Sequence, residues 1–197
     1  MTDPNASPTA PAPGADPLPE LLQDLRHDVW EVRRNAAEEL AALNDRRATI
    51  PLCRCLDDGV GGVRYAAAEA LGRIQDPLSI PSLIKLLGDP TFGVYGPVIE
   101  ALANMRAMGA VPYFIGFLQH DDARIRSLAA NSLLILTRQP IPFKAKGKPE
   151  ERAQGYALWE QWWDKNKEHY HELALQQHQE AEEAARQAGI GVRRAEG

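Results

Sequence analysis

The chain repeats itself every 31 residues, and this period limits its fold more than any other feature. Apolar residues recur at this spacing in columns of four. Three such columns are Val32, Val63, Val94 and Ile125, then Leu40, Leu71, Leu102 and Leu133, then Leu43, Ile74, Met105 and Leu136. Within one copy the apolar positions lie three or four residues apart, which is the spacing of one face of an α-helix. Four copies of one amphipathic helix are therefore predicted.

A shorter helix is predicted before each amphipathic helix, and its clearest copy is residues 80–87, IPSLIKLL. Its first turn holds a proline, where the missing N–H costs no helical hydrogen bond. These prolines are Pro19, Pro51, Pro81 and Pro112. One helix pair cannot bury both of its apolar faces, whereas stacked pairs close a common core. We therefore expect an all-α fold, a short right-handed α-solenoid of four helix pairs with a C-terminal capping helix.

The whole repeat is clearest in residues 62–77, GVRYAAAEALGRIQDP, followed by Ile80-Pro81-Ser82-Leu83. This stretch resembles the bacterial HEAT-like repeat of the phycobilisome-lyase type, and the resemblance covers residues 18–138. It implies four repeats with the approximate bounds 18–45, 46–76, 77–107 and 108–138. Most proteins with such repeats are adaptors, and a minority are enzymes.

The segments outside the repeats differ in composition. Residues 1–17 hold five prolines and almost no large apolar side chain, so a disordered Pro/Ala-rich arm is predicted. Residues 139–149 predict a loop, and residues 150–167 predict a capping helix over the last repeat. Its large rings are Trp159, Trp162 and Trp163. Residues 168–197 have only a weak alanine stripe, so we expect a solvated helical extension and a flexible tail.

Charge limits the kinds of partner that the chain can bind. The formal net charge is −5, which argues against a nucleic-acid partner because such domains usually carry a basic excess. No apolar run approaches the roughly 20 residues that cross a bilayer, and no signal-peptide pattern opens the chain. We expect a cytoplasmic protein that binds neither nucleic acid nor membrane.

The two cysteines, Cys53 and Cys55, are predicted to be reduced thiols. Two residues apart on a helix, their side chains point about 200° apart and cannot form a disulfide. No further soft ligand lies beside them in the sequence, so we expect no metal site. The sequence also shows no clustered catalytic groups and no cofactor motif, and we expect no catalytic residue and no cofactor.

An arginine column follows the Val/Ile column in three of the four repeats. Its members are Arg33, Arg64 and Arg126, and the aspartates of the inter-helix turns are Asp28, Asp58, Asp89 and Asp121. The resemblance implies structural pairing between the two sets, which we prefer. An anion-binding ladder is the alternative, although the aspartates would neutralise it.

A second ladder consists of Glu38, Glu69 and Glu100 at the same step in three successive repeats, followed by Asn131. Second helices line the concave face of such solenoids, so these carboxylates would form an acidic track for a basic protein or peptide. The alternative is that glutamate is a soluble helix former at a tolerant surface position.

Repeat three breaks its own pattern with Phe92, Tyr95, Gly96 and Pro97. Proline deep inside a helix lowers stability by about 3 kcal/mol or more, so we expect a structural or functional cause for it. Either the helix starts late, near Pro97, or a kink opens a groove lined by Phe92 and Tyr95. These rings, with the nearby Met105 and Met108, form the alternative partner-binding surface, and we prefer it to the acidic ladder.

The sequence is compatible with two functions. The first is a non-enzymatic scaffold or adaptor that binds a protein partner on the concave face. The alternative, which the resemblance implies, is a bilin (tetrapyrrole) lyase or a chaperone-like protein of the phycobilisome-lyase type.

Overall fold

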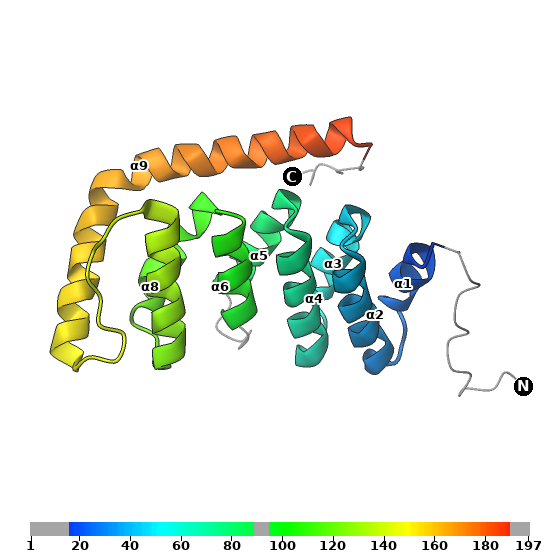
Figure 1. Cartoon of the computed structure of the whole chain (residues 1–197), viewed down its shortest axis with the longest axis horizontal. Coiled ribbons are helices and arrows are strands. Elements are labelled where there is room, and N and C mark those ends of the chain that lie inside the picture. Colours follow the sequence, from blue (N-terminus) through cyan, green and yellow to red (C-terminus); the bar gives the residue numbers. More distant parts are fainter. Residues whose placement is uncertain (1–15, 89–94, 190–197) are drawn as a thin grey trace, which may run out of the picture.

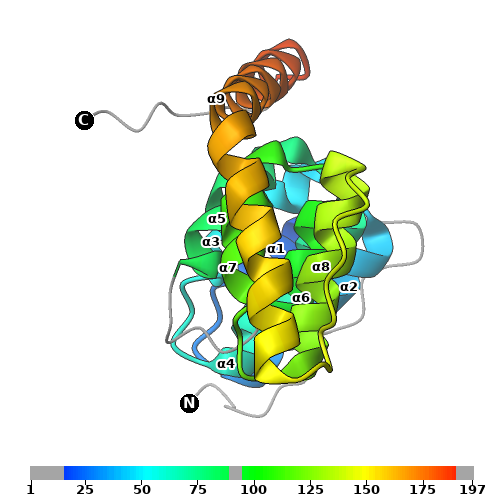
Figure 2. The same cartoon turned by 90° about the vertical axis from the view of Figure 1, so that its left-hand side faces the viewer.

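The computed structural model describes residues 16–88 and 95–189, and every regular element in them is a helix. Four helix pairs follow one another along the chain. They are α1 (Leu18–Asp24) with α2 (Trp30–Leu43), α3 (Thr49–Cys55) with α4 (Gly61–Ile74), α5 (Ile80–Leu87) with α6 (Tyr95–Asn104), and α7 (Val111–Phe117) with α8 (Ala123–Thr137). The second helices form one layer and the first helices form the other (Figures 1 and 2). The predicted all-α solenoid is confirmed.

The turn between one pair and the next has a regular geometry. Asn44, Gln75 and Arg106 lie 31 residues apart and all adopt the left-handed conformation, with φ of 54°, 52° and 52°. A 3-10 turn follows each of them and leads into the next first helix, whose first turn holds the expected proline. These turns are η1 (Arg46–Ala48), η2 (Pro77–Ser79) and η3 (Met108–Ala110). They stack along one edge of the solenoid.

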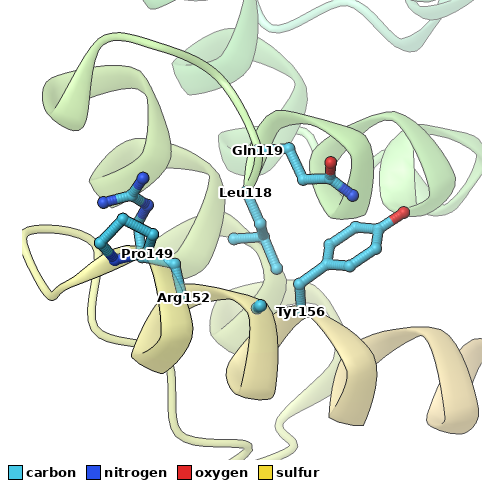
Figure 3. A pocket seen from close by; sticks show the side chains of 6 residues that line it. Leu118, Gln119, Pro149, Arg152 and Tyr156 are labelled. Atoms are coloured by element: carbon cyan, nitrogen blue, oxygen red, sulfur yellow. The ribbon is translucent and has the colours of Figure 1, made fainter.

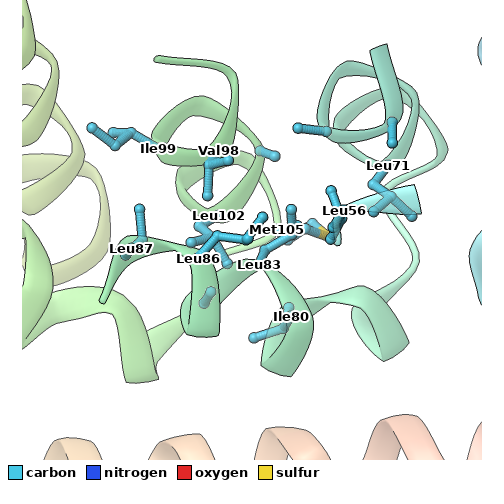
Figure 4. Packing of buried hydrophobic residues seen from close by; sticks show 14 of the residues in the cluster. Leu56, Leu71, Ile80, Leu83, Leu86, Leu87, Val98, Ile99, Leu102 and Met105 are labelled. Atoms are coloured by element: carbon cyan, nitrogen blue, oxygen red, sulfur yellow. The ribbon is translucent and has the colours of Figure 1, made fainter. Parts of the chain in front are cut away.

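The core lies between the two layers. Leu40, Leu71, Leu102 and Leu133, which form one of the sequence columns, are fully buried. Figure 4 shows the same packing in the third repeat, where Leu83 and Leu86 of α5 point toward Leu102 of α6 and toward Met105, which follows that helix. Small residues let the second helices approach closely. A methyl group on Gly72 would lie 3.1 Å from the Cβ of Ala101 on the neighbouring helix.

Repeat three is described only in part. The described part of α6 begins at Tyr95, and residues 89–94 lie outside the described residues. Pro97 is the third residue of this part. The late helix start and the kinked groove both stay predictions. Phe92 lies outside the described residues.

The C-terminal helix α9 (Pro149–Gln187) corrects one expectation. Its first half lies against the end of the stack, and its second half turns and runs along the edge formed by the inter-repeat turns (Figures 1 and 2). The segment expected to be solvated is therefore docked, with Tyr170, Ala181 and Ala185 buried. Alanines suffice for this contact because their small side chains let the helix backbone approach the turns.

One glutamine fastens this second half of α9. The Nε2 of Gln177 donates to the carbonyl oxygens of Met105 and Arg106, both at 3.2 Å. Its Oε1 accepts from the N–H of Met108 at 3.3 Å. These backbone groups follow the end of α6, where helical hydrogen bonding stops. The glutamine thus supplies partners that a helix end needs.

Two other expectations concern the N-terminal arm and the C-terminal tail, which the structure describes only in part. Of the N-terminal arm only Asp16 and Pro17 are described, and the tail beyond Gly189 lies outside the described residues. Within the described ranges, no helix is both long enough and apolar enough to cross a bilayer.

Candidate protein-binding face

The outer surface of α2, α4, α6 and α8 is called the second-helix face below. Glu38, Glu69 and Glu100 are all exposed on it, one on each of the first three second helices. Asn131 is exposed at the matching position of α8. Helical periodicity explains this placement, because each of these residues follows a buried residue of the core by one position and precedes another by two. The repeat therefore presents one polar side chain per helix at a constant step.

In the first repeat the carboxylate of this column is already paired. The Nε of Arg34 lies 3.4 Å from Oε1 of Glu38, four residues further along the helix. The same guanidinium lies over the ring of Trp30, 5.4 Å from its centroid. A ring, a cation and a carboxylate thus meet on the surface of α2.

In the second repeat an aromatic ring takes the place of the arginine. Tyr65 is 44% exposed, and its hydroxyl donates to Oε1 of Glu69 across 3.4 Å. The pKa of Tyr65 is raised, first by the charge of Glu69 and then by partial burial, with a smaller contribution from Glu100 on the next helix. Sequence reasoning missed Tyr65, although its position 31 residues after Arg34 was the available signal.

The aromatic surface expected at repeat three is only partly described. Tyr95 is half-buried, with its ring centroid 4.8 Å from that of Phe117 and 5.7 Å from that of His120. Met105, expected at the same surface, is instead buried, and its sulfur accepts from the Ser79 hydroxyl at 3.6 Å. Met105 was misplaced because its column is a core column. Tyr95 is thus already in contact with other rings of the chain.

The arginine column braces the inter-helix turns. Arg33 makes a bidentate ion pair with Asp58 of the next repeat, at 2.7 and 3.0 Å, and this pair lowers the pKa of Asp58. Arg64 donates to the carbonyl oxygens of Asp58 and Gly59 in its own turn. Arg126 donates to those of His120, Asp121 and Ala145. These contacts agree with a structural role and leave the anion ladder without support.

The tryptophans of α9 gather in one aromatic cluster. Trp159 is buried and meets Trp162 edge to face, with centroids 5.5 Å apart. Trp162 and Trp163 also contact Tyr170, with centroids 5.3 and 6.1 Å apart. The cluster lies where α9 changes direction, and the capping role of the three tryptophans stays a prediction.

Three hollows border α9. One of about 240 Å³ lies where α7 ends and α9 begins, lined by Leu118, Gln119, Arg152 and Tyr156 (Figure 3). Two more, of about 330 and 350 Å³, flank its second half. Across residues 16–88 and 95–189, no group of three His, Cys, Asp or Glu side chains is placed to hold a metal ion. Cys53 and Cys55 are free thiols, as expected.

Comparison with known proteins agrees with this fold. Residues 18–96 match the family of HEAT repeats. Residues 18–96 therefore form HEAT-like repeats. Its solenoid is similar to the structure of the complex of CpcE and CpcF of phycocyanin lyase from Nostoc sp. PCC7120, with 32% identity and a TM-score of 0.57. That match covers 63% of this chain and 54% of the other, so the chain spans only about half of its relative.

Two engineered proteins share the architecture at lower identity. They are 19% and 21% identical to this chain, with TM-scores of 0.53 and 0.55. Each match covers 74% of this chain, and 68% and 70% of the engineered chains. These likenesses show the fold alone. A comparison with curated proteins gives no significant match.

Proposed function

We infer that the chain is a non-enzymatic scaffold or adaptor that holds a protein segment on its second-helix face, the side expected to be concave in such a solenoid. The observation that supports this most directly is the exposure of Glu38, Glu69 and Glu100 at one position per repeat. The helices that carry them are backed by a fully buried core column, so the carboxylates stand on a rigid surface. A preorganised surface loses little entropy when a partner binds.

The chemistry of this face favours a basic partner. Exposed carboxylates attract positive side chains and repel nucleic acid. The alternative surface around Phe92 and Tyr95 gains less support, because the Tyr95 ring is half-buried against Phe117 and His120. We therefore reverse the preference drawn from the sequence and place the partner on the acidic face.

Affinity capture from the source cell with two forms of the chain tests this function. The first is the parent, and the second carries Glu38→Gln, Glu69→Gln and Glu100→Gln together. A protein retained by the parent and lost from the triple variant is expected, with less retained as salt rises.

A matched control carries Glu168→Gln, Glu172→Gln and Glu183→Gln, three exposed glutamates on α9. This control removes the same charge and should retain the partner. Equal retention by all three forms, with equal helical circular dichroism, would contradict binding at the acidic face.

A second candidate function is a component of a bilin lyase. It is favoured by the 32% identity to the phycocyanin lyase complex. Mixing the purified chain with a free bilin and recording its absorption spectrum tests this. A red shift and sharpening that saturate at one bilin per chain would favour the lyase-type function, whereas an unchanged spectrum would count against it.

A further inference from the structure

The three carboxylates of the acidic column differ in charge balance. Glu38 has Arg34 one helical turn before it, with Nε of the arginine 3.4 Å from the carboxylate. Glu69 and Glu100 form no ion pair within the described parts of the chain, although both are exposed. The column therefore holds one carboxylate that is paired with an arginine, Glu38, and two carboxylates that have no ion pair within the described residues, Glu69 and Glu100. These two are called the free carboxylates below.

The positions one turn before the two free carboxylates explain the difference. Where the first repeat has an arginine, the second has Tyr65 and the third has Gly96. Arg73 follows Glu69 by one turn, but its guanidinium is not within ion-pair distance of it. Glu100 is followed at the same step by Asn104, which carries no charge. The cation of the first repeat has no counterpart here.

Tyr65 lies beside Glu69, and α6, which carries Glu100, packs against its helix. The Tyr65 hydroxyl donates to Glu69, and Glu100 occupies the same column position on α6. Tyr65 is 44% exposed, so its ring is accessible to a partner. An exposed ring beside a carboxylate attracts a cation by its quadrupole and by the negative charge, and a second carboxylate on the neighbouring helix adds to that charge.

The chain itself shows how such a cation sits. Arg34 lies over the ring of Trp30 and beside the carboxylate of Glu38. On α4 and α6 the ring and the carboxylates are present but the cation is missing. One guanidinium or ammonium group from another molecule would supply it. We propose that Tyr65, Glu69 and Glu100 form a subsite for one Arg or Lys side chain of a basic partner segment, a subsite that rests on the scaffold function inferred above.

Binding of fluorescein-labelled hexa-arginine, followed by anisotropy at 0.15 M salt, tests this subsite. Tyr65→Leu, Glu69→Gln and Glu100→Gln should each raise Kd about two- to fivefold, because each removes one exposed cation contact. Tyr65→Phe keeps the ring and should stay near the parent value. Glu168→Gln is the matched control, since it removes the same charge from an exposed glutamate on α9 rather than on the second-helix face.

A loss below about twofold is expected for Glu168→Gln, because longer-range charge effects are screened beyond ~8 Å at this salt. Equal losses from Glu168→Gln, Glu69→Gln and Glu100→Gln would overturn the subsite and leave only a diffuse effect of net charge. An unchanged Kd for Tyr65→Leu would overturn it as well. Each variant must keep the helical circular dichroism of the parent.

The test also separates the subsite from the scaffold function. If the captured protein is lost from the triple variant while the single variants bind hexa-arginine alike, the scaffold stands and the subsite fails. If the subsite is confirmed with hexa-arginine but no protein is captured, the scaffold fails. Tighter peptide binding by a chain that ends at Gly189, and so lacks Arg193 and Arg194, would identify the chain's own tail as the occupant and overturn the assignment to a partner.

Discussion

Single side chains join neighbouring repeats, and Arg33 with Asp58 is the clearest case. The carboxylate of Asp58 binds the guanidinium through two oxygens and also accepts from the N–H of Val60. Both side chains are mostly buried, with 17% and 11% exposed. The pair therefore links the first turn of α2 to the turn between α3 and α4, where solvent screening is weak.

Asp58→Asn should lower the free energy of unfolding by about 1.5–3 kcal/mol at neutral pH, because hydrogen bonds to a charged group are lost. Arg33 holds the pKa of Asp58 below its ordinary value, so the folded state favours the ionised form. The stabilisation is present above the unfolded pKa of about 3.9 and is lost as pH falls through the lower folded pKa. Urea unfolding at several pH values should show the two proteins converging below about pH 4. Asp57→Asn, at an exposed neighbour, should change little.

The two thiols differ from ordinary surface cysteines. Burial raises the pKa of both Cys53 and Cys55 to about 11, against roughly 8.5 in an unfolded chain. At pH 8 the folded protein should therefore react with Ellman's reagent much more slowly than the protein in urea, since the thiolate is the reactive form. Equal rates in the two states would contradict the burial of these side chains.

At the scale of the elements, α9 is where the structure adds most. Gln177→Ala should free the carbonyls of Met105 and Arg106 and the N–H of Met108. We expect a loss of about 1–3 kcal/mol and faster hydrogen exchange at Met108, because partly buried polar groups lose partners. Gln176→Ala is the control, since Gln176 is exposed and donates to Glu180 on its own helix. Equal exchange in the two variants would mean that Gln177 does not fasten α9.

The period predicted the repeats well because stacking imposes one apolar column per helix face. It placed α4 and α8 one and three periods after α2. The docking of α9 was missed because its contacts use alanines and one glutamine, which leave no apolar period in the sequence. Tyr65 was missed for a related reason, since only the packing of α6 against α4 brings the helix that carries Glu100 next to it.

At the scale of the whole molecule, stability comes from stacking, and Leu102 tests it. This residue is fully buried in the third repeat, whereas Leu134 is 50% exposed on α8. Leu102→Ala should cost about 2–5 kcal/mol from lost burial and a cavity. Leu134→Ala should cost less than 1 kcal/mol, because little area is removed from water. Similar midpoints of urea unfolding for the two variants would contradict the observed register.

In an ordinary solenoid each repeat touches only its neighbours, but here α9 contacts the end of the stack and two inter-repeat turns. This bridge should make a four-repeat array unfold as one unit. With Trp30→Phe as background, fluorescence reports only Trp159, Trp162 and Trp163 at the C-terminal end, while circular dichroism reports all helices. The two signals should coincide in urea for the full chain. In a chain that ends at residue 170, the fluorescence transition should occur at a lower urea concentration than the circular dichroism transition. The reason is that the last repeat is no longer connected to the middle of the stack by α9. Coincident transitions in both chains would show that stacking alone supplies the cooperativity.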